Sequence, residues 1–265
     1  TNCVMDESDS KIKFDSNGVC DHCHDFEINT KPLWMPDKNG RRILNDIVTK
    51  IKKDGKGRDF DCVLGMSGGA DSSYLLHLAV KELNLRPLVF HVDTGWNSRG
   101  AVNNIQRMVE KLGVDLYTDV INWKEMADVQ RSFFKSGVPH VDLPQDIAYT
   151  SATYYWASKH NIKYILDGHS FVEEGITPLQ NNYFDGQYIK SINKKYGKLK
   201  MKTFPLMTLK NFLKWTIILR IKRIRPFWYL SYSKEEAKVY LKNKFDFVDY
   251  GGSHHENKMS LFYHT

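Results

Sequence analysis

Apolar runs of strand length alternate with amphipathic stretches through most of the chain. The runs cover 61–66, 87–93, 115–121 and 163–167, and apolar residues recur at helical spacing over 71–84, 98–112, 124–136 and 145–160. This alternation predicts βαβ units, so we expect an α/β fold with a parallel sheet between two layers of helices. Further helices are predicted within 31–60, near 208–222 and near 233–244, where Ser233 and Glu236 form a capping box. The basic cluster from Arg220 to Arg225 is expected on the solvent face of a helix.

The composition narrows the class of protein. The 265 residues include 38 lysines and arginines against 31 carboxylates, a net charge of +7 that suits nucleotides, sugar nucleotides or RNA as partners. No apolar stretch approaches the ~20 residues of a membrane helix and no secretory signal is visible, so we expect a cytoplasmic protein with no membrane partner. Four cysteines in a chain of this length indicate a reducing compartment rather than a disulfide framework.

The most informative segment joins the strand predicted at 61–66 to the helix predicted at 71–84. It reads Ser67-Gly68-Gly69-Ala70-Asp71-Ser72. A glycine turn between a strand and a helix directs backbone N–H groups and the helix N-terminus at phosphate, and the two serines add hydroxyl donors. No Lys-Ser/Thr pair follows, so this is not a Walker A loop. The alternative is an ordinary tight turn.

Two more polar loops are expected at the same edge of the sheet, where open parallel sheets bind their ligands. Asp93 follows the second strand, in a position to meet a ribose, a base or magnesium, and Gly168 and His169 follow the fourth strand. Each residue alone is explained by loop capping. Three such loops on one rim predict a nucleotide cleft.

The first 30 residues contain three of the four cysteines. Cys20 and Cys23 form a C-x-x-C knuckle, and Cys3 lies upstream. This spacing fits tetrahedral zinc, with His22, His24 or a cysteine just before the first residue as the fourth ligand. A redox pair or unrelated buried thiols are the alternatives.

The SGGxDS form of the loop resembles the pyrophosphate loop of the N-type ATP pyrophosphatases, which cleave ATP between the α and β phosphates and adenylate a substrate oxygen. Within that superfamily the chain resembles the N-acetyl sugar amidotransferases of bacterial surface-polysaccharide and nonulosonic-acid biosynthesis. The resemblance is carried by residues 3–6, 14–23, 67–72, 92–98, 144–146, 183–191 and 251–257. Members of that branch usually begin with a complete C-x-x-C and continue well beyond the last segment, so the resemblance implies that this chain is part of a longer protein.

The resemblance also implies the fold of the adenine nucleotide alpha hydrolases and an AMP-forming reaction. The residues expected to bind ATP are Ser67, Gly68, Gly69, Asp71, Ser72, Asp93, Gly168 and His169. Ser67, Asp71 and Ser72 would be catalytic, with Asp71 the nearest ligand for magnesium. Glutaminase and cyclase-like partner subunits would supply ammonia, which converts the acetamido group of a nucleotide-linked sugar into an acetamidino group.

The lysine-rich segment 183–202 is expected to recognise the nucleotide sugar. Its cations would meet a diphosphate and its aromatic rings would stack on a sugar or base; a solvated lysine-rich hairpin is the alternative. The predicted substrate residues are Tyr183, Asp185, Tyr188, Lys190, Lys194 and Lys195.

The predicted organisation has four parts: a zinc-binding cysteine knuckle in 1–30, a helix and linker in 31–58, an ATP pyrophosphatase core in 59–180, and a substrate-recognition and helical region in 181–265. Two other functions stay open. A tRNA-modifying ATP pyrophosphatase, of the thiolase or lysidine synthetase type, would fit the basic charge and the aromatic content. No cysteine pair follows the loop for sulfur transfer, so nucleic acid is not the expected partner. A non-enzymatic ATP-binding scaffold for the glutaminase is the third possibility.

Overall fold

A parallel β-sheet forms the centre of the molecule. The computed structural model describes residues 2–174, 185–251 and 256–264. Each neighbouring pair of strands is parallel, and the order across the sheet is β3-β2-β1-β4-β5. The strands are β1 (Cys62–Gly65), β2 (Pro87–Asp93), β3 (Leu116–Val120), β4 (Tyr164–Leu166) and β5 (Lys222–Ile224). All of them therefore end at one edge of the sheet, as the sequence predicts.

Helices connect the strands and extend the chain at both ends. The α-helices are α1 (Asp21–Asp25), α2 (Lys38–Asp54), α3 (Ala70–His77), α4 (Arg99–Leu112), α5 (Trp123–Ser136), α6 (Leu143–Lys159), α7 (Phe171–Glu174), α8 (Gly186–Tyr196), α9 (Leu209–Leu213), α10 (Lys234–Phe245) and α11 (Lys258–His264). π-helical turns continue α1, α3 and α9 over Phe26–Thr30, Leu78–Glu82 and Lys214–Ile218. At the start of α10, the Ser233 side chain accepts a hydrogen bond from the Glu236 N–H group, which confirms the predicted cap. None of the helices in the described ranges has the length and apolar character needed to span a bilayer.

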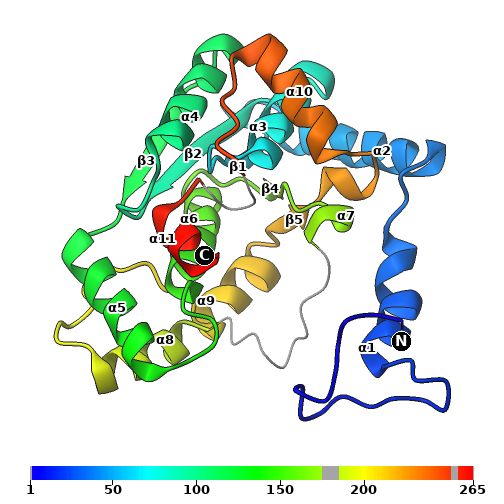
Figure 1. Cartoon of the computed structure of the whole chain (residues 1–265). Helices are drawn as coiled ribbons and strands as arrows, with labels where there is room; N and C mark the ends of the chain where they lie inside the picture. The colour runs from blue at the N-terminus through cyan, green and yellow to red at the C-terminus, as the bar shows by residue number, and fades with distance from the viewer. Residues whose placement is uncertain (1, 175–184, 252–255, 265) are drawn as a thin grey trace.

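Side chains that alternate along the strands supply two separate hydrophobic cores. In β1, Leu64 packs into a core with α2, α3, α4 and α10, whereas its neighbour Val63 packs into a core with α5, α6 and α8. Figure 1 shows these two sets of helices on opposite sides of the sheet. The predicted three-layer α/β/α class is therefore confirmed.

The segment that follows α9 corrects one prediction. The helix predicted over 208–222 ends at Ile218, and Arg220 has a φ of +54°, which breaks the helical path. The cluster from Arg220 to Arg225 is not a helix face, because its middle residues form β5 at the edge of the sheet. Only three residues pair there, too few for alternation to reveal a strand in the sequence.

Candidate functional site

The loop between β1 and α3 holds its backbone N–H groups at the carboxyl edge of the sheet. The Ser67 N–H group donates to Ser72 Oγ at 3.3 Å, and the Gly69 N–H group donates to Ser67 Oγ at 3.2 Å. The two hydroxyl oxygens lie 3.1 Å apart. The hydroxyls expected to bind phosphate therefore already hold the loop in its curved conformation, at the N-terminus of α3.

Gly68 is the most constrained position of this loop. Its φ of +86° lies in the left-handed region, and a Cβ placed there would lie 2.4 Å from the carbonyl oxygen of Ala101 in α4. The Gly68 carbonyl oxygen accepts hydrogen bonds from Asn104 Nδ2 at 3.2 Å and from Tyr250 Oη at 2.9 Å. Only glycine fits this position, both for its conformation and for its distance to α4.

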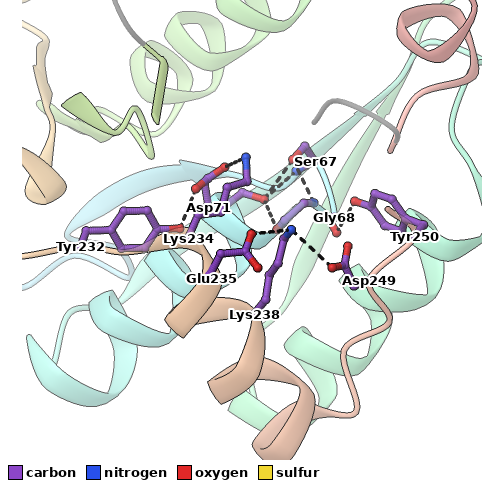
Figure 2. A network of polar contacts seen from close by, with 11 residues as sticks. Ser67, Gly68, Asp71, Tyr232, Lys234, Glu235, Lys238, Asp249 and Tyr250 are labelled. Atoms are coloured by element: carbon purple, nitrogen blue, oxygen red, sulfur yellow. Dashed lines mark hydrogen bonds and ion pairs between the residues drawn. The ribbon is translucent and has the colours of Figure 1, made fainter. Parts of the chain in front are cut away.

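A charged network lies beside the loop, on the side of α10 (Figure 2). Tyr232 donates to Asp71 Oδ1 at 2.6 Å, and Lys234 Nζ lies 3.0 Å from Asp71 Oδ2. Lys238 lies 3.0 Å from Glu235 and 3.3 Å from Asp249, and these carboxylates raise its pKa. Asp71, the predicted magnesium ligand, is thus bound by a hydroxyl and an ammonium group in this structure.

A cavity of about 350 Å³ opens on the other side of the loop, with Ser67 in its wall. Its floor comes from the end of β2. His91 Nδ1 lies 2.7 Å from the Met66 carbonyl oxygen, and His91 Nε2 lies 2.9 Å from Asn97 Nδ2. Both ring nitrogens of His91 therefore have a polar partner, which fixes the orientation of the imidazole. Asn97 also donates to Asp93 Oδ1 at 2.9 Å, so Asp93 holds the loop after β2 together.

The cavity is also lined by residues at the start of α6 and in the C-terminal segment. Gln145 Oε1 accepts hydrogen bonds from Thr94 Oγ1 at 2.9 Å and from Asn257 Nδ2 at 2.6 Å, and Gln145 Nε2 donates to Asp142. Ser260 Oγ donates to the second oxygen of Asp142 at 2.9 Å. These residues form a polar wall, cross-linked by hydrogen bonds, in the same cavity that Ser67 lines.

Two ionisable groups in this wall have shifted pKa values. Burial raises the pKa of Asp142, and the negative charge of Asp146 raises it further. The hydrogen bond to Asp146 raises the pKa of His140, whose Nε2 lies 3.2 Å from that carboxylate. A carboxyl group with a raised pKa is a better proton acceptor than an ordinary carboxylate.

The loop after β4 has mainly structural contacts. Asp167 accepts a hydrogen bond from the His169 N–H group at 3.2 Å and pairs with Arg225 at 3.2 Å. Trp228 Nε1 donates to His169 Nδ1 at 3.3 Å, and burial lowers the pKa of His169. The backbone of Gly168 lies close to Asp71, so the predicted rim residues Gly168 and His169 do lie beside the loop.

The cysteines predicted to bind zinc come together at the N-terminal end. The Sγ atoms of Cys3, Cys20 and Cys23 lie within 4.8 Å of one another, which suits three corners of a tetrahedral zinc site. His22 and His24 do not join them, because their Nε2 atoms lie 2.8 and 2.9 Å from carboxylates. The three thiols are the one metal-ligand cluster found in residues 2–174, 185–251 and 256–264.

The predicted substrate residues are not brought to the loop or to the cavity. Lys190, Lys194 and Lys195 are exposed on α8, which packs against α5 and lies well apart from α3 in Figure 1. Asp185 caps α8 by accepting from the Gln187 N–H group, and Tyr188 packs edge-on against the Phe133 ring. Tyr183 lies outside the described residues. Substrate binding by these side chains stays a prediction.

Comparison with known proteins identifies the family. The model of the phosphoadenosine phosphosulfate reductase domain matches residues 61–222, more than half of the chain. The chain belongs to this family. The phosphoadenosine phosphosulfate reductase domain has the PP-loop fold of the ATP pyrophosphatase superfamily, as the Ser67–Ser72 loop predicts. The match does not distinguish the sugar amidotransferases from other branches.

Individual relatives are distant. An uncharacterized protein of Methanocaldococcus jannaschii is 27% identical over 126 residues, which cover 44% of this chain and 43% of that protein, so less than half of the relative's length is matched. The NH3-dependent NAD synthetase of Campylobacter jejuni is 15% identical over 78% of this chain and 85% of its own, with a TM-score of 0.38. The NMN synthetase of Francisella tularensis is 14% identical over 84% and 91%, with a TM-score of 0.37.

Several residues of the site were missed by sequence reasoning. They are Asn104, Asp142, Tyr232, Lys234, Lys238 and Tyr250. All except Asn104 and Asp142 lie more than 150 residues from the loop in sequence, and no local motif marks them. Gln145 and Asn257 lay within segments that carried the family resemblance, so that resemblance was the available signal for this wall.

We expect Gly68→Ala to abolish ATP binding and to lower the free energy of unfolding by more than about 2 kcal/mol, through left-handed strain and the contact with Ala101. Gly113→Ala is the matched control, because Gly113 has a φ of +66° and open space around its Cα. The control should cost about 1 kcal/mol and leave ATP binding unchanged. Calorimetry and denaturant titration measure both effects. If the two variants had the same ATP affinity and the same free energy of unfolding, the close packing of the loop against α4 would be contradicted.

We expect the three clustered thiols to bind one zinc ion, because their sulfur atoms are already assembled. Elemental analysis of protein purified without added metal should find a stoichiometry near one. Cys20→Ser with Cys23→Ser should lose the metal. Cys62→Ser is the control, since this thiol lies in the core of β1 and should destabilise the fold without releasing zinc. A metal-free wild-type protein that stays stable in chelator would show that the thiols have no metal role.

Proposed function

We propose that this chain is the synthetase component of an ATP-dependent N-acetyl sugar amidotransferase. It adenylates the acetamido oxygen of a nucleotide-linked sugar and uses ammonia from glutaminase and cyclase-like partners to form an acetamidino group. AMP and pyrophosphate are released. The resemblance of the segments around the loop, α6 and the C-terminal region supports this branch of the superfamily.

The observation that carries the proposal is the polar cavity beside the loop. Ser67 contributes both to the hydrogen bonds of the loop and to the cavity wall. A nucleotide on the loop would therefore lie next to a space that is also lined by Gln145, Asn257 and Asp142, which offer amide and carboxyl groups. These are groups that can hydrogen-bond an acetamido group and its hydroxylated ring.

The reaction requires two displacements. In the first, the amide oxygen attacks the α-phosphorus and the bond between the α and β phosphates breaks, so pyrophosphate leaves. In the second, ammonia attacks the activated carbon and AMP departs with the former carbonyl oxygen. One proton must leave the attacking nitrogen. The N–H groups of the loop and of α3 are placed to stabilise negative charge on the phosphates.

We assign to Asp142 the role of accepting this proton from the attacking nitrogen. Its pKa is raised by burial and by Asp146, and it lines the same cavity as Ser67. A carboxylate of this kind accepts a proton more readily than an exposed one at neutral pH. His140, paired with Asp146, keeps the cavity wall ordered around it.

Magnesium and zinc have different places in this proposal. Magnesium would neutralise charge on the departing pyrophosphate, and it is commonly held by one or two carboxylates plus phosphate oxygens. Asp71 fits that role once ATP competes for Lys234, which pairs with it in the structure. Zinc at the three thiols would fix residues 2–30 rather than take part in the reaction.

We expect AMP release to require a nucleotide-linked acetamido sugar, and an ammonium salt at raised pH to replace the glutaminase. Mass spectrometry of the sugar should show exchange of the carbonyl oxygen for NH. Asp71→Asn should lose AMP production, because it removes the negative charge next to the loop. Asp46→Asn is the control, since it changes an exposed carboxylate of α2 that is not part of the charged network, and it should keep activity. AMP release triggered by tRNA would favour a tRNA-modifying enzyme. AMP release in the absence of both tRNA and the sugar would refute the requirement for a nucleotide-linked acetamido sugar.

We expect Asp142→Asn to lower kcat about 100-fold with ATP binding unchanged, because the proton acceptor is lost. In the wild-type protein the rate should rise with pH through the raised pKa of Asp142, since only the ionised form accepts a proton. Asp146→Asn removes a charge that raises this pKa, so the acid limb should move to lower pH. An unchanged pH profile in Asp146→Asn would show that Asp142 is not the acceptor.

A further inference from the structure

The positive charge of this chain is concentrated in one segment. Residues 186–225 contain 12 of the 38 lysines and arginines and none of the 31 carboxylates, so the remainder of the chain has more carboxylates than cations. The segment comprises α8, α9, the π-helical turn after α9, and β5. Eleven of its cationic residues are exposed; only Arg225 is half-buried.

Asp167 pairs with Arg223 and Arg225, but the carboxylates next to the lysines of this segment do not neutralise them. Buried Glu125 accepts hydrogen bonds from the backbone N–H groups of Lys202, Thr203 and Phe204, and buried Asp128 accepts from the backbone N–H groups after α8. Both carboxylates therefore bind the backbone, which leaves the lysine side chains outside. None of the nine lysines in 186–225 forms an ion pair with a described residue of the chain.

Large aliphatic side chains are exposed on the same surface. Trp215 fixes the helical segment by stacking on Tyr154 at 5.4 Å, and this leaves the outer face in solvent. Ile217 is 65% exposed and Ile218 is 74% exposed. The exposed apolar side chains of this face are Leu209, Phe212, Leu213, Ile217 and Ile218.

Cations surround these apolar side chains. Lys210 and Lys214 lie between them in the helix, and Arg220 and Lys222 follow directly. Lys190 of α8 lines a groove of about 540 Å³ together with Lys210 and Leu209, so α8 and α9 share one surface. A helix with exposed large aliphatic residues and flanking lysines, in a segment without carboxylates, has the pattern of helices that lie in the headgroup region of a bilayer.

We propose that the surface formed by α8, α9 and the turn after α9 binds anionic phospholipid membranes. The lysines would meet lipid phosphates, and the exposed leucines and isoleucines would enter the boundary between headgroups and acyl chains. This mode of binding needs no spanning segment, so it agrees with the absence of such a helix among the described residues. The proposal differs from the expectation of no membrane partner, which considered only a spanning helix and stays a prediction.

RNA fits this surface less well than lipid. Single-stranded RNA is bound by stacking its bases on exposed aromatic rings or arginine planes. Four of the five exposed apolar residues here are aliphatic, and nine of the twelve cations are lysines. Phosphate recognition is common to both ligands, but aliphatic insertion applies only to the bilayer.

The test is flotation of the full chain with lipid vesicles. The protein should float with vesicles of phosphatidylcholine and phosphatidylglycerol, should not float with phosphatidylcholine alone, and should be released by salt. Leu209→Ser with Ile217→Ser and Ile218→Ser should weaken vesicle binding at least about tenfold, and Lys210→Gln with Lys214→Gln and Lys222→Gln should do the same. Circular dichroism checks that the variants are folded.

Matched controls use exposed residues outside this surface. Val120→Ser with Val239→Ser removes exposed apolar residues from β3 and α10, and Lys50→Gln with Lys53→Gln and Lys242→Gln removes three exposed cations. Both controls should bind vesicles as the wild type does. Failure of the wild-type protein to float, or equal loss in the controls, would overturn the proposal. Binding of a homopolymer RNA through the same lysines, without vesicle binding, would assign the surface to nucleic acid.

Discussion

The hydrogen bonds to the carbonyl oxygen of Gly68 connect the loop to the C-terminal segment. Asn104 donates to this oxygen and also forms two hydrogen bonds with the backbone of Val248, so one amide joins the loop, α4 and the segment after α10. Tyr250 adds a second donor to the same carbonyl. The matched family domain ends at residue 222, yet the curvature of its loop is held by residues beyond that point. The segment after α10 therefore helps to hold the loop in its conformation.

Sequence reasoning succeeded where the signal is local. The loop, the strands on either side of it and the parallel sheet follow from short apolar runs and from glycines next to a helix start, and the structure places them within a residue or two of the prediction. The sequence analysis did not predict β5, because the signal for this strand is not local. Its three residues pair with β4 only because the chain turns at Arg220, and basic residues three positions apart, such as Arg220 and Arg223, also fit one side of a helix.

The residues around the loop that were missed depend on tertiary contacts. Tyr232 and Lys234 reach Asp71 from α10 and its preceding turn, where their sequence context is that of an ordinary solvent-facing helix start. Likewise, no sequence signal marks Asp142, and its pKa is raised only because the fold buries its side chain and places it close to the charge of Asp146. Residues that gain their chemistry from neighbours far along the chain leave no periodic or motif signal.

The charged residues beside the loop are not the residues that give the chain its positive net charge. At the loop, two lysines are paired with the three carboxylates of Asp71, Glu235 and Asp249, so this network has no excess of positive charge. ATP would have to exchange these carboxylates for its phosphates, and the attraction of a bare cationic cleft is absent. The net charge of +7 instead comes from the segment 186–225 on another part of the molecule. The basic composition of this chain therefore does not by itself indicate a nucleotide site. The cations that produce the net positive charge lie on a surface where the exposed apolar side chains are mostly aliphatic.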